Sequence, residues 1–485
     1  MIFSRFFFFI IFITISELVF SQKATKEILN LLLEDESLKH ASISINTLDL
    51  DDNKVILEHN PNTSLIPAST LKVITTATAL AVLGPNYQFR TTIEHDGHIK
   101  NGILEGNLYL RGFGDPTLAS PFMDNIPKID SLFQILLNKI KAAGILKIKG
   151  NVIADGTYFE KSSVAPNWQW EDLGNYYGSG VSGLNIHDNL YILNLKASNQ
   201  IGDSPEIISC SPKLYQFEFI NQLKTADKNS GDNSVIFSYP NSIEAILEGT
   251  IPQSDKEFPI SGSISNPELF AAEWLHDNLT KNGIEIRGKA LCQSNFYANK
   301  NRSQIHTHYS PYLINIIKHT NEFSRNMYCE ALIKSIGVKL KSSGGLDSGL
   351  VAIKEFWERR NINCSGFYQK DGSGLSARNV ISSSTLTNII TSIYKDSLTF
   401  PGFLNALAVA GKTGNFKEFG KNSILENNYV GKGGTLSRVK TYTGYLKTSS
   451  NKNIAFTVLV NNFTCSSREM KLKLEKFLIA LAENY

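Results

Sequence analysis

The stretch that most constrains the fold of this chain runs from Pro67 to Pro85, PASTLKVITTATALAVLGP. No residue from Val73 to Leu83 is charged. A proline ahead of a helical run is a start signal, and Gly84 followed by Pro85 is a strong stop signal. A helix that is uncharged on every side beyond its first turn belongs in the middle of a large domain. The stretch therefore predicts one central, buried helix.

Ser69 and Lys72 stand three residues apart at the start of this helix, so their side chains share a face. Burial disfavours the charged ammonium and lowers the pKa of a lysine, which would let Lys72 act as a base towards the Ser69 hydroxyl. The N–H groups of the helix N-terminus suit a developing oxyanion. A capping serine and a snorkelling lysine would give the same S-x-x-K pattern. Its interpretation therefore depends on partners further along the chain.

The composition describes a large globular protein. At 485 residues, of which 42% are hydrophobic, the chain can form about two to four domains with their own cores. A net charge of +3 gives no reason to expect nucleic acid as a partner. The five cysteines lack C-x-x-C spacing and the nine histidines are dispersed, so no metal site is predicted.

The N-terminus has the pattern of a secretory signal peptide. Arg5 supplies one positive charge, the run from Phe6 to Ile15 is apolar except for Thr14, and a cleavage point is expected near Ser21. No later run reaches the ~18 apolar residues of a membrane span. We therefore expect residues 1–21 to be removed and the mature protein to be exported to the periplasm and soluble.

Three further regions follow the signal peptide. Alternating apolar residues between Ala41 and His59 predict a β-hairpin that leads into the Ser69 helix. From about Thr91 to Pro267 the chain reads as short strands and turns with one clear helix, Ile129–Ala143, which predicts a β-rich insertion. The predicted division is 22–90 and 268–485 for the main domain and 91–267 for the insertion. Helical periodicity returns at Pro267–Asn282, Pro311–Ile336, Gly349–Arg360 and Ser384–Asp396.

The last hundred residues predict an antiparallel meander followed by a helix. The strand candidates are Gly434–Val439, Lys440–Lys447 and Asn453–Asn461. The amphipathic helix Ser466–Asn484 either contacts a membrane surface or, as the stronger interpretation, packs on the sheet with its lysines in water. We therefore expect an α/β fold of the α+β kind, with a central antiparallel sheet flanked by helices and a large β-rich insertion that forms one or two small domains.

Two downstream motifs offer partners for Ser69. In Ser324-Arg325-Asn326, a hydroxyl can relay a proton and an amide can bind a peptide group, both of which acyl transfer needs. A third, lysine-containing motif has two candidates. Lys412-Thr413-Gly414 matches K-T-G literally, whereas Lys432-Gly433-Gly434 lacks the hydroxyl. The second lies in KGGTLSRVKTYTGYL, a strand–turn–strand pattern that can lay its backbone along an extended substrate, so we favour Lys432.

S-x-x-K, S-x-N and K-[TS]-G in this order resemble the penicillin-recognising serine acyl transferases, which include D-alanyl-D-alanine peptidases and β-lactamases. The long segment between the first two motifs is similar to the class C low-molecular-mass penicillin-binding proteins, the D-alanyl-D-alanine carboxypeptidase/endopeptidase family. The resemblance covers nearly the whole mature chain. That family has an AVAG-like stretch before its K-T-G strand, where Lys412 falls, so Gly433 departs from the usual Thr or Ser. Further family-like motifs are Gly114–Leu118, Asp155–Phe159, Ala165–Trp170 and Asp371–Ser376.

The resemblance implies a β-lactamase/transpeptidase-like fold and a role for each motif residue. Ser69 would be the nucleophile and Lys72 its general base. Ser324 would pass the proton to the leaving amine, Asn326 would hold the substrate amide, and Lys432 would place positive charge near the substrate carboxylate. The reaction would hydrolyse D-Ala-D-Ala or cross-link bonds of peptidoglycan, with no metal or organic cofactor.

The resemblance also implies the substrate contacts. Gly433, Gly434 and Thr435 would line the substrate, with the N–H groups of Ser69 and Thr435 as the oxyanion hole. Asp155 would bind the free amino group of the stem-peptide diamino acid, although an aspartate in an Asx-turn before a glycine would read the same way. The implied partners are peptidoglycan stem peptides and, as covalent inhibitors, β-lactams.

Two alternatives to an active carboxypeptidase stay open, and the first of them follows from Gly433. Loss of one hydrogen bond to a charged group costs ~1.5–3 kcal/mol, so the protein could instead be a catalytically weak peptidoglycan-binding or scaffold homologue. Thr435 could partly replace the hydroxyl, and Gly433→Thr is then expected to raise turnover. A β-lactamase is disfavoured by the long insertion and by the lack of an obvious deacylating glutamate motif.

Overall fold

A computed structural model describes residues 27–293 and 301–485, and the predicted signal peptide lies outside them. The chain divides into two compact units. The first unit comprises the chain up to Ala81 together with Ile317–Ser324 and Ile353–Tyr485, and the second comprises Val82–Ile316 and Arg325–Ala352.

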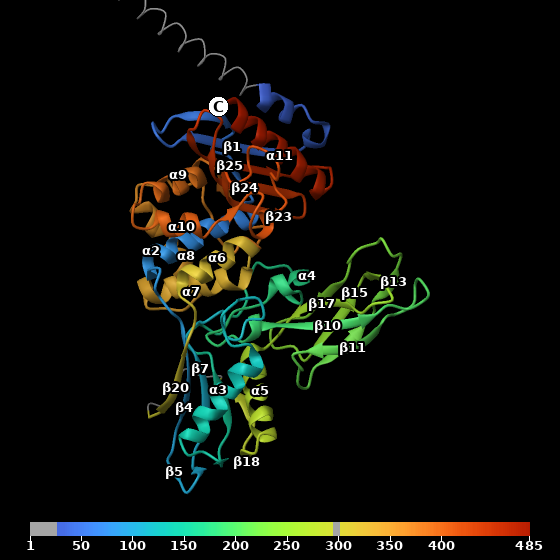
Figure 1. The fold of residues 1–485 in the computed structure, drawn as a ribbon, viewed down its shortest axis with the longest axis vertical. Coiled ribbons are helices and arrows are strands. Elements are labelled where there is room, and N and C mark those ends of the chain that lie inside the picture. The colour runs from blue at the N-terminus through green and yellow to red at the C-terminus, as the bar shows by residue number, and fades with distance from the viewer. Residues whose placement is uncertain (1–26, 294–300) are drawn as a thin grey trace, which may run out of the picture. The chain divides into compact units, whose positions relative to one another are not determined.

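The first unit is built on a six-stranded antiparallel sheet in the order β2-β1-β25-β24-β23-β22 (Figure 1). The predicted hairpin is confirmed, because β1 and β2 pair. The predicted strand Gly434–Val439 is wrong: Arg438, with φ 56°, turns the chain, and β23 begins earlier. The motif Lys432–Gly434 therefore lies inside a strand. The bounds are β1 Ser42–Asp49, β2 Val55–His59, β22 Ala408–Val409, β23 Tyr429–Leu436, β24 Val439–Lys447 and β25 Asn453–Asn461, with β3 Ser64–Leu65 paired to β21 Ile381–Ser382 outside it.

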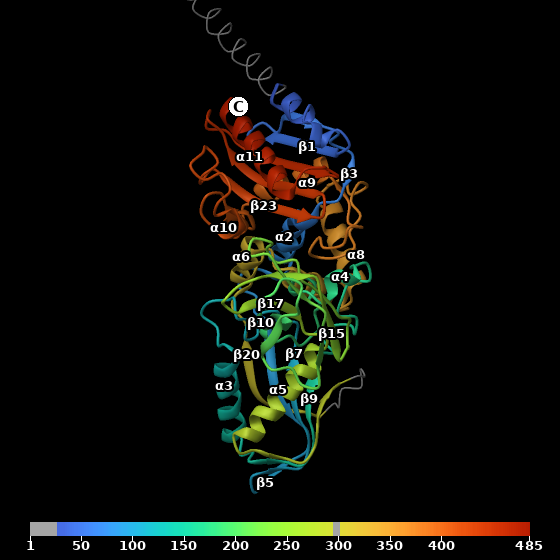
Figure 2. The ribbon, with the colours of Figure 1, turned by 90° about the vertical axis from the view of Figure 1, so that its right-hand side faces the viewer.

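Helices cover both faces of this sheet. Helix α11 (Ser467–Asn484) lies across one face, where Phe477 shares a hydrophobic core with Phe456 of β25 and Tyr442 of β24 (Figure 2). Helix α9 (Ser383–Tyr394) lies on the other, where the Tyr445 hydroxyl donates to the carbonyl of Ile390 over 2.8 Å. The final helix thus packs on the sheet, and among the described residues no helix is long and apolar enough to cross a membrane. Helix α10 spans Phe400–Asn405.

The central helix is buried as predicted, but it starts differently. A 3-10 turn, Ala68–Leu71, precedes α2 (Lys72–Leu83), and the α2 residues from Lys72 to Leu80 are buried. The polar contacts of α2 beyond Lys72 are made by threonine hydroxyls and not by charged side chains. Thr75 donates to the carbonyl of Gly372 over 2.7 Å, and Thr78 accepts from the indole N–H of Trp357 over 3.0 Å. The helix therefore makes polar contacts with the loop at Gly372 and with the indole of Trp357 without carrying a charge beyond Lys72.

The predicted helix Pro311–Ile336 is two helices, α6 (Leu313–Phe323) and α7 (Asn326–Lys341). The break falls at Ser324, which has a φ of 60°, outside the range of a right-handed helix. Ser324 thus stands at the break, just beyond the end of α6. Helix α8 spans Leu346–Glu358.

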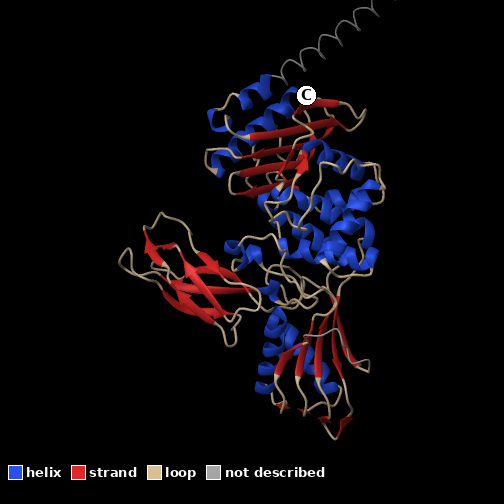
Figure 3. Ribbon diagram, turned by 180° about the vertical axis from the view of Figure 1, so that it is seen from behind, coloured by secondary structure: helices blue, strands red, loops and turns tan. Residues whose placement is uncertain are grey.

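The second unit has two strand-rich parts (Figure 3). In one, α3 (Ile129–Ala142) and α5 (Pro267–Lys281) share a hydrophobic core with two mixed sheets. Those sheets contain β4 Arg90–His95, β5 Ile99–Lys100, β6 Ile103–Leu104, β7 Leu108–Gly112, β8 Lys147–Ile148, β9 Val152–Asp155, β18 Glu285–Ile286, β19 Ala290–Cys292 and β20 Ser303–Tyr309. The other part contains α4 Trp170–Leu173, β10 Leu190–Lys196, β11 Glu206–Ser211, β12 Glu218–Asn221, β13 Lys224–Ala226, β14 Val235–Phe237, β15 Glu244–Glu248, β16 Thr250–Pro252 and β17 Phe258–Ser263.

The β-rich insertion extends beyond the predicted boundary at residue 267. Helix α5 starts at that point, but its Phe270, Trp274 and Leu275 are buried in the core of the second unit. The strands that follow α5 pair with β8, β9 and β4 of the same unit. Periodicity identified α5 as a helix, whereas its partners are set by contacts distant in sequence.

Candidate active site

Ser69 and Lys72 form a hydrogen-bonded pair at the junction of the 3-10 turn and α2. The Nζ of Lys72 donates to the Oγ of Ser69 over 2.9 Å and to the carbonyl of Ser373 over 2.7 Å. The Lys72 side chain is fully buried, whereas Ser69 is half-buried. A lysine at this distance can take the hydroxyl proton once it is itself neutral.

The turn that presents Ser69 is held from several sides. Ala68, immediately before the serine, has a φ of 47°, a conformation that costs free energy for a residue with a Cβ. The carbonyl of Pro67 accepts from the Thr441 hydroxyl over 2.7 Å, and the N–H of Ile66 donates to Oδ1 of Asn461 over 2.9 Å. Strands β24 and β25 therefore fix the position of a strained turn, which aims the hydroxyl.

The loop Asp371–Ser376 supplies the second contact of Lys72. The buried Asp371 carboxylate accepts from the N–H groups of Gly374 and Ser376, over 2.7 and 2.6 Å, and from the side-chain amide of Asn379 over 2.8 Å. These bonds shape the loop that places the Ser373 carbonyl on the ammonium. In the sequence this loop stands out only as a family-like motif without an assigned role. The signal that points to its role is an aspartate in a glycine-rich turn.

Strand β23 brings Lys432 to Ser324. The Nζ of Lys432, 3% exposed, donates to the Ser324 Oγ over 3.0 Å and to the Gly433 carbonyl over 2.8 Å. A Cβ on Gly434 would lie 2.8 Å from the Ser69 nitrogen, so the strand approaches the serine turn too closely for a side chain. Lys432 is thus the motif lysine beside Ser324, whereas Lys412 is exposed in the turn before Gly414–Phe416.

Asn326 and Asp155 belong to the second unit, and their contacts there are structural. Asn326 begins α7 and donates its amide to the Tyr177 carbonyl over 2.8 Å. Asp155 is fully buried, and its carboxylate accepts from the Thr157 N–H over 3.0 Å and from Arg302 over 2.6 Å. Burial alone would raise the pKa of Asp155, but these hydrogen bonds outweigh it and hold the pKa low. The Asx-turn interpretation describes this aspartate, and its contact with substrate stays a prediction.

Aromatic rings cover the position where the sequence lacks a hydroxyl. A Cβ on Gly433 would lie 3.0 Å from Cε1 of Tyr442 and 3.1 Å from Cε1 of Phe416. Both rings are buried, and Phe416 also packs on Phe419 and Tyr429 with ring centroids 5.4 and 5.0 Å apart. Glycine is therefore the residue that this cluster accommodates without a shift, and a side chain at position 433 would be overpacked.

This packing reverses the expectation for Gly433→Thr. The variant should lose ~1–3 kcal/mol of unfolding free energy through overpacking and gain no turnover. Thermal unfolding and D-alanine release measure the two effects. The double variant Gly433→Thr/Phe416→Leu should recover part of the lost stability, because the smaller side chain gives room. A single variant that is as stable as the wild type and turns over faster would contradict this account.

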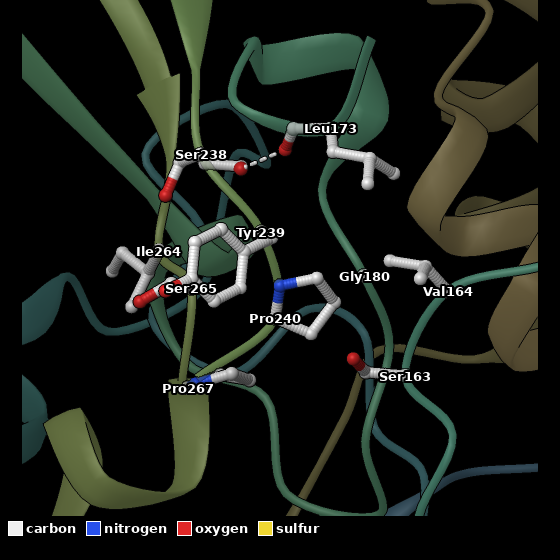
Figure 4. Close-up of a pocket in the computed structure, with 11 residues that line it drawn as sticks. Ser163, Val164, Leu173, Gly180, Ser238, Tyr239, Pro240, Ile264, Ser265 and Pro267 are labelled. Atoms are coloured by element: carbon white, nitrogen blue, oxygen red, sulfur yellow. Dashed lines mark hydrogen bonds between the residues drawn. The ribbon is translucent and has the colours of Figure 1, made fainter. Parts of the chain in front are cut away.

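The second unit contains two adjoining pockets, and neither is lined by a predicted site residue, although the larger one includes Gly156, Thr157 and Phe159 of the Asp155–Phe159 motif. One lies between Tyr239 and Pro240 on one side and Ser163 and Val164 on the other (Figure 4). The other, about 180 Å³, is lined in part by Glu268, whose pKa is raised by burial. Among residues 27–293 and 301–485, no three histidine, cysteine or acidic side chains lie together as a metal site would need.

The first unit therefore holds a serine bonded to a buried lysine, a second serine–lysine pair and a strand that, from Lys432 to Leu436, pairs only with β24 in the described sheet. The serine can attack a carbonyl, the lysine can take its proton, and the open strand edge can align an extended peptide. These features define a serine hydrolase that works through an acyl-enzyme.

Comparison with known proteins identifies the family. The model of the D-Ala-D-Ala carboxypeptidase 3 (S13) family matches residues 25–484. The chain belongs to this family of serine-type D-Ala-D-Ala carboxypeptidases, which confirms the resemblance found in the sequence. A relative, the D-alanyl-D-alanine carboxypeptidase DacB of Haemophilus influenzae, is 26% identical over 432 residues, which cover 88% of this chain and 86% of the relative.

Solved structures show the same fold. Penicillin binding protein 4 (dacB) from H. influenzae is 24% identical with a TM-score of 0.80, over 92% of this chain and 97% of that one. A second structure of it, complexed with a novel β-lactam, is 24% identical with a TM-score of 0.76, over 93% and 97% of the two chains. The α/β fold with extra β-rich sheets is thus confirmed.

Proposed function

We propose that this carboxypeptidase cleaves the terminal D-alanyl-D-alanine bond of peptidoglycan stem peptides, and D-amino-acid cross-links between them, through an acyl-enzyme on Ser69. The observation that carries the proposal is the 2.9 Å hydrogen bond between Ser69 and a fully buried lysine. Burial disfavours the charged form of a lysine, which favours Lys72 as the base that takes the proton of Ser69.

Acylation begins when neutral Lys72 takes the proton of Ser69 and the Oγ attacks the carbonyl of the penultimate D-alanine. The N–H groups of Ser69 and Thr435 receive the oxyanion, a contribution worth ~3 kcal/mol per donor in a comparable acyl transferase. The closeness of Gly434 to the Ser69 nitrogen supports this arrangement, since Thr435 follows on the same strand.

Departure of the leaving group needs a proton on its amine. Ser324 passes this proton on, and Lys432, bonded to its hydroxyl over 3.0 Å, keeps the surroundings positive. The family resemblance further implies that Asn326 holds the substrate amide and that Asp155 meets the free amine of the diamino acid. Water then hydrolyses the ester on Ser69.

β-Lactams would acylate the same serine, because their strained amide presents a carbonyl in place of the scissile bond. The β-lactam complex of the H. influenzae protein supports this. The pattern of residues 1–21 supports export to the periplasm, where the peptidoglycan substrate lies.

Labelling with a fluorescent penicillin tests the proposal. The wild type should carry the label and Ser69→Ala should not, while Ser397→Ala, at an exposed serine, should label like the wild type. Wild type that has not been treated with penicillin should also release D-alanine from a pentapeptide and cleave cross-linked muropeptides. Absence of Ser69-dependent label contradicts the proposal, rapid loss of label indicates a β-lactamase, and label without either cleavage indicates a scaffold protein.

A further inference from the structure

The face of β23 that carries Gly433 also carries Thr435. In the register of the hairpin Gly433 lies opposite Tyr442 and Thr435 opposite Lys440, and alternate residues of a strand share a face. The Nζ of Lys440 donates to the Oγ1 of Thr435 over 2.8 Å. A hydroxyl and an ammonium therefore stand two residues along from the position where the family's hydroxyl is absent.

Lys440 has no acidic counterpart. No ion pair between described residues includes it, and the charged side chain that most affects it is another cation, Lys471 of α11. Burial, together with the like charge of Lys471, lowers the pKa of Lys440 to about 8. Keeping a half-buried ammonium beside a second cation costs free energy unless an anion arrives from outside.

Thr435 carries the influence of the Lys440 ammonium to the open edge of β23. Its side chain is exposed, and because its oxygen accepts from Lys440, its own hydrogen is left to donate. A hydroxyl polarised by an ammonium is a stronger donor. The fitting acceptor is an anionic group carried by an extended peptide, which is what a C-terminal carboxylate provides.

The family resemblance already implies a substrate contact at Thr435. We propose that Lys440 is a positioning residue for this contact, because its ammonium holds the Thr435 hydroxyl so that the hydroxyl donates to the terminal carboxylate of the substrate. The pair of Thr435 and Lys440 does the work of a hydroxyl at position 433, where a side chain would force the rings of Tyr442 and Phe416 to shift by a few tenths of an ångström. This inference rests on the proposed function, because it specifies how that substrate is held.

The inference is tested with two substrates, a peptide with a free C-terminal carboxylate and the same peptide with a C-terminal carboxamide. For N-acylated L-Lys-D-Ala-D-Ala, Lys440→Met should raise KM ~10-fold with little change in kcat, the loss expected for a weakened charge-assisted hydrogen bond. For the C-terminal carboxamide of the same peptide, KM should not change. Lys440→Arg, which keeps the charge, should restore most of the affinity, and Thr435→Val should behave like Lys440→Met.

The matched control is Lys447→Met, at an exposed lysine at the far end of β24. It should bind both peptides like the wild type. Equal losses on the acid and the amide, or no loss on either, would overturn the inference. Should Lys440→Met fail to fold, Thr435→Val gives the same decision, because it leaves the ammonium in place and removes the contacting group.

The outcome can be separated from the proposed function. A wild type that releases no D-alanine refutes the proposed function, and acylation by a penicillin and by its methyl ester then tests the pair alone. Lys440→Met should slow acylation by the free acid ~10-fold and leave the ester unaffected. Equal slowing of acid and ester would overturn the inference.

Discussion

Replacing Lys72 by methionine is expected to lower the rate of Ser69 acylation by ~10³-fold, the usual contribution of a well-placed general base. The side chain is fully buried, so an apolar side chain of similar length fits and removes the cost of burying an ammonium. The Ser373 carbonyl loses its Lys72 donor, which offsets this gain, so the melting temperature should change little. Stopped-flow acylation by a fluorescent penicillin and thermal unfolding measure the two effects.

Two control variants distinguish a general-base role of Lys72 from a role in which it supplies only positive charge. Lys72→Arg keeps a cation but cannot lose its proton at accessible pH, so it should be as slow as Lys72→Met. Lys334→Met, in the second unit, removes another buried lysine whose pKa burial lowers to about 8, and it should acylate normally. An arginine variant that acylates at the wild-type rate would show that Lys72 supplies only charge.

The central helix and its Ser–Lys pair could be predicted because they depend on residues close in sequence. An uncharged run between a proline and Gly-Pro specifies a buried helix, and residues three apart on it must share a face. Helix α11 is similar, since its capping box of Ser466 and Glu469 is local. The lysine of the third motif was found through the strand–turn–strand pattern around it.

The features that were missed depend on contacts between distant residues. The residues around Ser324 have a helical pattern throughout, and only the φ of 60° at Ser324 separates α6 from α7. The crowding at Gly433 comes from Phe416, seventeen residues earlier, and from Tyr442 across the hairpin. The Ser373 carbonyl reaches Lys72 across 301 residues of sequence. No periodicity or motif spacing encodes such a distance.

That long-range contact leads to the second large expected effect. Asp371→Ala should lower the acylation rate ~10²-fold, because the loop that aims the Ser373 carbonyl at Lys72 loses the acceptor of three hydrogen bonds, and a displacement of ~1 Å in a catalytic group costs about that much. Buried donors left without an acceptor cost ~1–3 kcal/mol each, so the unfolding free energy should fall as well. The loss should appear in kcat more than in KM, since Asp371 positions the base and does not touch substrate.

Asp396→Ala separates the loss of catalysis from a loss of stability. Asp396 caps a turn in the same way, accepting from the N–H groups of Leu398 and Thr399 over 3.1 and 3.2 Å, but it lies before α10 and makes none of the contacts that hold Lys72. That variant should be less stable yet acylate normally. Asp371→Asn, which keeps one oxygen acceptor, should lie between the wild type and Asp371→Ala in rate. If Asp371→Ala is destabilised but acylates like Asp396→Ala, the Ser373 carbonyl is not needed to position Lys72, and the base is held by Ser69 and the helix alone.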